Sequence, residues 1–342
     1  MPVRPVDVAT WMVRHGFAVH PLAPGAKTPP PNCRACTAGA HQPQYCPCHA
    51  EHGWCHGFHA ATTNLNTVQH WWSTQPGFGI GIACGPSRLV VIDVDAHTDR
   101  PPHRSRLLPG ISIHDSVDLA GLSSGFDTLA LLAAYRRRPN PCDDTSTLRV
   151  QTPSGGMHIW YRMPRHTPAF KSSSGSSNRT ALAWQVDIRA ANGYIVAPGT
   201  RTTAGVYQAL PGARIPAPLP LWLVAELTRT GHRTDAPAPS KPPAPISSRP
   251  GNAPRVLAAL LKEVEDCGAV PEGAAFSEKL NRAAFTAGGL VQSGHLHGVE
   301  TRQILIETAT RARPHQPRKN AHIVETGMRA GSTRPIRPEE RT

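Results

Sequence analysis

The sequence lacks a long apolar run. No stretch approaches the roughly 20 hydrophobic residues that a membrane-spanning helix needs. The apolar region near the N-terminus is interrupted by Asp7, Arg14 and His15, which argues against a secretory signal peptide. We therefore expect an intracellular, cytoplasmic protein without membrane contact.

Acidic residues are scarce relative to basic ones. The chain has 36 Lys and Arg against 23 Asp and Glu, a formal net charge of +13. Such an excess favours a polyanionic partner, most simply nucleic acid, although an Arg-rich protein with no such partner would share it. Hydrophobic residues make up only 39% of the chain, and the 36 prolines indicate long irregular segments.

A nucleoside-triphosphate P-loop is also absent. No Gly-x-x-x-x-Gly-Lys-Ser/Thr sequence occurs, so we expect no fused helicase, and any replicative helicase partner would be a separate protein. The chain is divided instead by seven prolines between Asp235 and Pro254, which predict a semi-rigid linker over 231–254.

The periodicity differs on the two sides of this linker. Before it, apolar patterns predict an α/β (α+β) fold, with helices at 8–15, 67–73 and 128–137 and strands at 17–22, 79–83, 89–95, 148–151, 157–163, 183–189 and 194–197. After it, apolar residues recur at helical spacing and predict three or four short helices in a small bundle.

Two carboxylates stand two residues apart at the end of one predicted strand. Asp93 and Asp95 follow the apolar run 89–92, and alternation along a strand points both side chains the same way. Such a pair is repulsive unless a cation lies between its members, and carboxylate oxygens suit Mg²⁺ or Mn²⁺. Two solvated acids at an exposed strand end would give the same pattern.

Two further strands carry candidate residues. Every second residue of the strand 183–189 is polar, which makes Asp187 a candidate third carboxylate, although any half-exposed strand alternates in this way. His158 follows the turn Ser154-Gly155-Gly156, whose backbone can approach phosphate oxygens closely. A tight hairpin followed by a structural histidine is the ordinary explanation of that motif.

In their order, these motifs resemble a known family. The chain reads VIDVD at 91–95, TPSGGMH at 152–158, VDIR at 186–189 and NGYIVAP at 192–198, preceded by PGAKTP at 24–29. Over about residues 5–225 this set resembles the bifunctional primase–polymerase branch of the archaeo-eukaryotic primase superfamily. Asn192 replaces a glycine of the family pattern, a mild change because Asn tolerates positive φ.

The resemblance implies a catalytic domain over 5–230, with a mainly antiparallel sheet that forms a cleft. It implies template-directed transfer of nucleotides from (d)NTPs to a 3′-hydroxyl, with a DNA template and primer as partners. Asp93, Asp95 and Asp187 would bind Mg²⁺ or Mn²⁺, and His158 would contact the triphosphate. The turn Ser154, Gly155 and Gly156 would bind the nucleotide, with Arg189 and Lys27 as phosphate clamps.

The region after the linker also resembles this family, through its position and its helical pattern. Residues 255–330 resemble a helical accessory domain, and 331–342 form a basic tail. Two alternatives to a polymerase are a non-catalytic, zinc-containing nucleic-acid-binding replication protein and a metal-dependent nuclease.

Five cysteines gather in the predicted insertion 31–57, and their spacing predicts a Zn²⁺ site. Exposed unligated thiols would oxidise readily, which favours metal binding. Four of the five, or three with a nearby histidine, would complete a tetrahedral and structural site, with Cys33, Cys36 and Cys55 as the firmest candidates. The full set is Cys33, Cys36, Cys46, Cys48 and Cys55.

Overall fold

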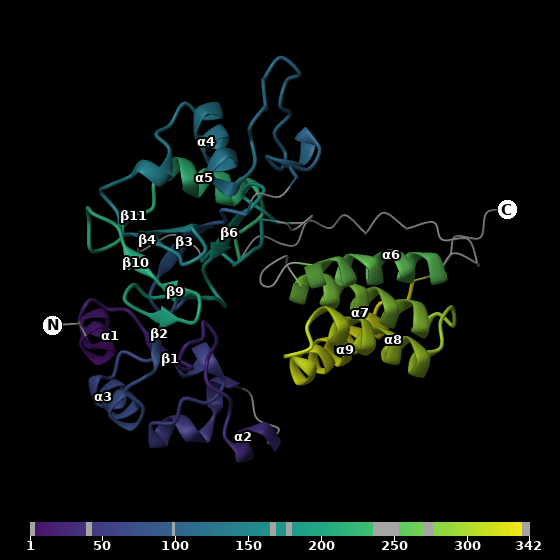
Figure 1. Cartoon of the computed structure of the whole chain (residues 1–342), viewed down its shortest axis with the longest axis horizontal. Coiled ribbons are helices and arrows are strands. Elements are labelled where there is room, and N and C mark those ends of the chain that lie inside the picture. The colour runs from purple at the N-terminus through teal and green to yellow at the C-terminus, as the bar shows by residue number, and fades with distance from the viewer. Residues whose placement is uncertain are drawn as a thin grey trace. The chain divides into compact units, whose positions relative to one another are not determined.

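The chain forms two compact units, Met1–Ala236 and Pro237–Thr342 (Figure 1). The computed structural model describes residues 4–38, 43–97, 100–164, 169–175, 180–234, 253–269 and 276–336. Most of the predicted linker, 235–252, and the last residues of the predicted basic tail, 337–342, lie outside the described residues. Each unit has its own hydrophobic core, and each is described by itself below.

A small antiparallel sheet begins the first unit. Its strands, in the order β1–β2–β7, are β1 (Val19–Leu22), β2 (Gly79–Ala83) and β7 (Tyr194–Val196). The helices α1 (Pro5–Arg14) and α3 (Leu65–Thr74) pack with it around the buried side chains of Phe17, Trp71 and Ile82. Asn64 begins α3 by accepting a hydrogen bond from the Thr67 amide, and its side chain therefore satisfies an amide that the helix leaves unpaired.

A larger sheet follows, and β3 (Leu89–Val94) lies inside it. Its strand order is β10–β4–β5–β3–β6, and β11 pairs in parallel with β5. The bounds are β4 (Arg149–Gln151), β5 (Met157–Arg162), β6 (Val186–Arg189), β10 (Gln208–Ala209) and β11 (Ala217–Pro218). Except for the β11 pair, the ladders of this sheet are antiparallel.

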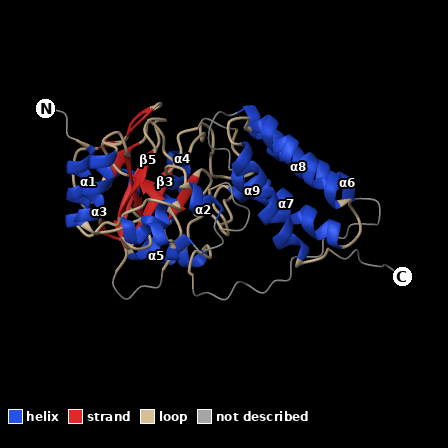
Figure 2. Cartoon of the chain, turned by 90° about the horizontal axis from the view of Figure 1, so that it is seen from below, coloured by secondary structure: helices blue, strands red, loops and turns tan. Residues whose placement is uncertain are grey.

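The two faces of β3 pack into different cores, which explains its continuous apolar run. Leu89 and Val91 join the core of the small sheet, whereas Val90 and Ile92 face the core around α4 (Gly125–Tyr135) and α5 (Leu221–Arg229). Figures 1 and 2 show α1 and α3 on one side of the strands and α4 and α5 on the other. A strand covered on both faces is apolar throughout until a functional residue interrupts it.

The predicted strand 183–189 begins later than its alternation indicated. Gln185 has a φ of +57°, and Ala183 bridges to Val186, so the chain turns before β6 starts. The Gln185 carbonyl accepts a hydrogen bond from the Asp95 amide at 3.0 Å and lies against Gly125. The expectation that Trp184 and Gln185 belong to the strand was therefore wrong. The Gln185 backbone contacts the end of β3 and the start of α4 instead of pairing in the β6 ladder.

The remaining strands and the 3₁₀ turns are short elements. The hairpin β8 (Arg201–Thr202) and β9 (Gly205–Val206) precedes β10, and six 3₁₀ turns occur in the described residues. The cysteine-rich insertion contains α2 (Arg34–Ala38), η1 (Pro43–Tyr45), η2 (Pro47–Glu51) and η3 (Gly57–Ala60). The others are η4 (Arg104–Arg106), η5 (Pro141–Asp143) and η6 (Asp266–Ala269).

The second unit is helical in its described residues. Its helices are α6 (Ala253–Glu265), α7 (Phe276–Gln292), α8 (Gly298–Ala312) and α9 (Pro317–Ser332). Glycines let α7 and α9 approach closely: a Cβ at Gly288 would collide with the Met328 carbonyl, and one at Gly331 with the Phe285 carbonyl. The backbones of the two helices are in direct contact here, so only glycine fits at these two positions.

The expected fold class is confirmed: a mixed α/β unit with mainly antiparallel sheets is followed by a set of helices. Within the part of the chain that the structure describes, no helix is long and apolar enough to cross a membrane. The cytoplasmic location stays a prediction.

Candidate active site

Three of the predicted site residues lie side by side across three strands. Asp93 of β3 is in register with His158 of β5 on one side and with Asp187 of β6 on the other. Residues directly opposite each other in antiparallel strands point to the same face, so these side chains converge although some 65 and 29 positions separate them in sequence. Asp95 follows on the same side, beyond the end of the strand.

Arg189 lies between the carboxylates of two strands. Its Nε donates to Asp93 Oδ2 at 3.3 Å, and its Nη2 donates to Asp187 Oδ2 at 2.6 Å. The other oxygen of Asp187 accepts the Gly175 amide at 2.6 Å. Both carboxylates are thus fixed by charge-assisted hydrogen bonds, which are stronger than neutral ones.

His158 completes the row from the other side. Its Nε2 lies 3.4 Å from Asp93 Oδ1, and its ring lies against that of Tyr207 at 5.5 Å. Burial lowers the pKa of His158, despite the opposing charge of Asp93, so the ring is neutral near pH 7. A neutral imidazole with a proton on Nε2 donates a hydrogen bond to an anion without adding a full charge.

The site carries more negative charge than its own cation balances. Burial, together with the negative charges of Asp93 and Asp187, raises the pKa of Asp95 to about 7. Burial likewise raises the pKa of Asp187, against the effect of Arg189. Three neighbouring carboxylates with one guanidinium between them leave an excess of negative charge, which favours the binding of a cation.

The turn Ser154-Gly155-Gly156 lies against the end of β3. Gly155 has a φ of +86°, and the Thr152 amide donates to the Gly156 carbonyl at 2.9 Å. A Cβ at Gly156 would lie 2.5 Å from the Val94 carbonyl oxygen, so the backbone there approaches β3 as closely as only glycine allows. The expected nucleotide-binding turn is therefore next to the two-aspartate motif.

Lys27 reaches the same region from a loop before the cysteines. Burial and the neighbouring carboxylates raise the pKa of Asp95, and the positive charge of Lys27 opposes that rise. Its loop is held by the bond of the Thr203 amide to the Gly25 carbonyl and by the Tyr194 hydroxyl, which donates to the Lys27 carbonyl at 3.0 Å. Asp93, His158, Asp187 and the glycine turn thus lie around the end of β3, whereas the role of Lys27 stays a prediction.

The chain also matches a known protein family by sequence. A sequence model of the family described as bifunctional DNA primase/polymerase, N-terminal, matches residues 9–222. The chain belongs to that family. A comparison with the curated proteins found none that matches the chain. The matched part of this primase/polymerase chain contains the two sheets and the row of Asp93, His158 and Asp187, called the acidic row below.

The cysteine cluster is a separate feature of the primase/polymerase unit. The thiols of Cys33, Cys36, Cys48 and Cys55 all lie within 4.8 Å of one another, a grouping that could hold a metal ion. Sγ–Sγ distances are 3.7 Å for Cys33–Cys48 and 3.3 Å for Cys36–Cys48. The amide of Cys36 donates to Cys33 Sγ at 3.5 Å and stabilises that sulfur as a thiolate, the form that zinc binds.

The fifth cysteine belongs to a different grouping. Cys46 lies with Cys36 and His56 and is not part of the four-thiol set. The sequence favoured Cys33, Cys36 and Cys55, and all three are members of the four-thiol set. Spacing alone gave no reason to choose Cys48 over Cys46, because both stand in the same Cys-Pro-Cys segment.

Three contributions to the site escaped the sequence motifs. The Gly175 amide holds Asp187, Tyr207 packs on His158, and Tyr194 holds the Lys27 loop. Only Tyr194 stood in a recognised motif, and nothing there indicated what its hydroxyl contacts. The other two come from segments without a chemical pattern, so the sequence offered no signal for them.

Proposed function

We propose that this chain is a template-directed DNA primase/polymerase that adds nucleotides from (d)NTPs to a 3′-hydroxyl. Its family supports a primase/polymerase function in general, with DNA and nucleotides as substrates. The observation that carries the specific proposal is the cross-strand row of Asp93, His158 and Asp187, with Asp95 and the glycine turn beside it.

Each residue of the site has a proposed role. Asp93, Asp95 and Asp187 would hold Mg²⁺ or Mn²⁺, which activates the 3′-hydroxyl and neutralises charge on the phosphates when bound. The amides of the turn 154–156 and the neutral ring of His158 bind phosphate oxygens by hydrogen bonds. Lys27 contributes a point charge to the triphosphate, as lysine does in other phosphate sites.

Arg189 has a second proposed role besides phosphate binding. Its side chain is 37% exposed, and its guanidinium already bonds to Asp93 and Asp187 on two neighbouring strands. We assign it the task of holding these two carboxylates at a fixed separation, so that the ligands are in place before the cation and the nucleotide arrive.

The proposed zinc ligands are Cys33, Cys36, Cys48 and Cys55, which offer the four thiolates of a structural site. The aspartates lie on other elements, so this zinc takes no part in phosphoryl transfer. The role of the C-terminal helices in template binding and the existence of a separate helicase partner stay predictions.

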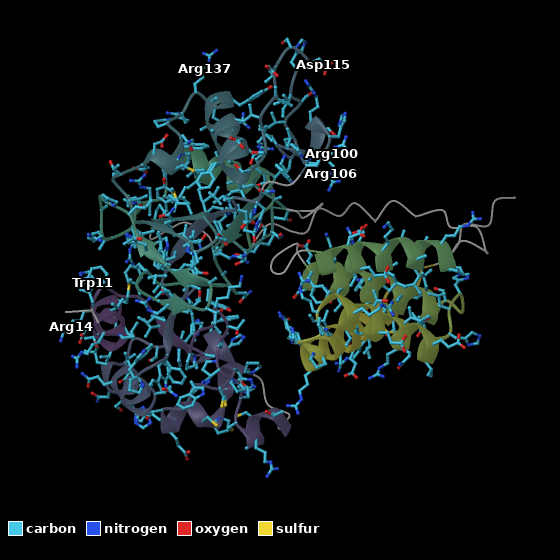
Figure 3. The ribbon with its side chains drawn as sticks, viewed as in Figure 1. Trp11, Arg14, Arg100, Arg106, Asp115 and Arg137 are labelled. Carbon is cyan, nitrogen blue, oxygen red and sulfur yellow. The ribbon has the colours of Figure 1, made fainter. Side chains whose placement is uncertain are left out.

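A nucleotide-incorporation assay tests the proposal. Primed and unprimed templates are incubated with labelled nucleotides and Mn²⁺, and wild type is compared with Asp93→Asn and Asp187→Asn. We expect each variant to lose at least about 100-fold in rate, because the remaining carboxylates bind the cation poorly. Asp115→Asn is the matched control: Asp115 is 95% exposed and lies at the edge of the unit (Figure 3), and its variant should keep full activity.

Two results would contradict the proposal. Wild type that incorporates no nucleotide with either template would argue for a non-catalytic nucleic-acid-binding protein. A template shortened by wild type but not by Asp93→Asn would argue for a nuclease.

A further inference from the structure

Only five residues separate the proposed phosphate-binding Lys27 from the first cysteine of the metal cluster, and this segment is held along its length. Asn32 accepts the His56 amide at 2.6 Å through its side-chain oxygen, and its nitrogen lies 3.2 Å from the His56 ring. Pro29 lies so close to Gly57 that a Cβ there would be 2.9 Å from its Cγ. Residues 33–60, called the cysteine module below, therefore hold the path of the chain that leads back to Lys27.

Tyr194 makes a second connection between the module and the same lysine. Its hydroxyl donates to the Lys27 carbonyl, while its ring stacks with Phe58 of η3 at 6.1 Å and 29°. Its other neighbour is His20, at 4.9 Å and nearly perpendicular. Tyr194 thus links an aromatic residue of the cysteine module to the backbone of the phosphate-binding loop.

The position of this linkage relative to the acidic row is fixed by the sheets. Tyr194 is paired with Ala83 in the small sheet, which fixes the place of its ring. A displacement of Phe58 or Tyr194 would therefore move the backbone of Lys27, and its ammonium with it, without any change in the carboxylates themselves.

We propose that the cysteine module positions Lys27 for the nucleotide triphosphate, with Phe58 and Tyr194 as the positioning residues that connect them. This inference rests on the proposed function and deepens it, since it gives the proposed zinc site a task in substrate binding. Lys27 touches the triphosphate; Tyr194 and Phe58 act through it.

The test separates binding from chemistry. In full-length, zinc-containing protein, nucleotide affinity is measured at equilibrium with Ca²⁺ as a non-catalytic cation, and KM and kcat are measured with Mn²⁺. We expect Tyr194→Phe to weaken nucleotide affinity and raise KM about tenfold, with kcat within about twofold, because the bond that holds Lys27 in place for its ground-state phosphate contact is lost. Zinc content should equal that of wild type, since the hydroxyl touches no thiol.

Two further variants test the connection. Phe58→Leu should weaken affinity in the same direction, and Tyr194→Phe combined with Lys27→Ala should be no weaker than Lys27→Ala alone, because both act through one contact. Tyr45→Phe, in the same module and 75% exposed, is the matched control and should bind as wild type does.

The outcomes distinguish this inference from the function on which it rests. If wild type incorporates nucleotide but Tyr194→Phe binds it with unchanged affinity, the positioning role is overturned and the polymerase stands. Additive losses in the double variant would overturn it as well. If wild type neither binds nor incorporates nucleotide, both fail.

Discussion

At the scale of single residues, the chemistry of the site depends on side chains that are close to one another but lie on different strands. Asp93 contacts both His158 and Arg189, and Arg189 also contacts Asp187. Each residue type was readable from the sequence, since Asp-x-Asp at the end of an apolar run predicts a shared direction. Their pairing across strands was not readable, because register is set by the sheet as a whole.

The choice among five cysteines gives a prediction at this scale. We expect Cys46→Ser to retain one zinc ion per chain, because the other four thiols lie together without it. Cys48→Ser should lose most of its zinc, since three ligands remain for a tetrahedral ion. Metal analysis of the two purified variants, which differ by two positions in one segment, makes the comparison. Equal zinc loss in both would contradict the assigned ligand set.

At the scale of elements, the segment 170–175 supports the third carboxylate. The Ser173 amide donates to the Ile188 carbonyl of β6 at 2.9 Å, and two residues later the Gly175 amide holds Asp187. The buried His232 anchors this segment from α5's end: its Nε2 lies 2.7 Å from the Ser173 hydroxyl, and its Nδ1 lies 2.7 Å from that of Thr230. Both contacts are made by a ring that is neutral in the fold.

This anchor predicts how stability depends on pH. Burial lowers the pKa of His232 to about 4, against 6.5 for an ordinary histidine. The unfolded chain therefore binds more protons between these values, and the free energy of unfolding falls as pH drops through that window. We expect this one group to make the protein about 2 kcal/mol less stable at pH 5 than at pH 7.

Urea unfolding at both pH values measures the effect. His232→Gln has no such proton to bind and should show a smaller difference between the two pH values, whereas the exposed His70→Gln should behave as wild type. An unchanged pH dependence in His232→Gln would show that the ring is not buried in its neutral form.

The elements also show where prediction from sequence stops. Helix periodicity and the apolar run before Asp93 identified α7 and β3 because each pattern is local. The alternation at 183–189 gave a wrong start for β6. Gln185 adopts a positive φ, which is uncommon for glutamine and could not be predicted from the residue type. Asn192 was expected to tolerate positive φ, and its φ is +60°.

At the scale of the whole molecule, the two units have separate hydrophobic cores. The buried clusters of the first unit contain no residue of the second, and the family match ends at residue 222, inside the first. A unit with its own core is expected to fold alone. We therefore predict that the fragment Met1–Ala236 unfolds cooperatively, retains zinc and extends a primer.

Thermal unfolding, zinc analysis and primer extension of that fragment check this prediction. A fragment that is unfolded, or that is folded but inactive, would show that the helical unit completes the first one. We expect exposed basic residues of the first unit, among them Arg100, Arg106 and Arg137 in Figure 3, to contact the template backbone in this fragment.

The central claim is that the acidic row transfers nucleotides under the direction of a template. The most direct measurement is the pyrophosphate released per nucleotide added to a primer on an oligo-dT template with Mn²⁺. We predict one pyrophosphate per adenine nucleotide incorporated, no incorporation of the other three nucleotides, and neither product with Asp93→Asn. Elongation without pyrophosphate, or no elongation by zinc-containing wild type, would contradict the account.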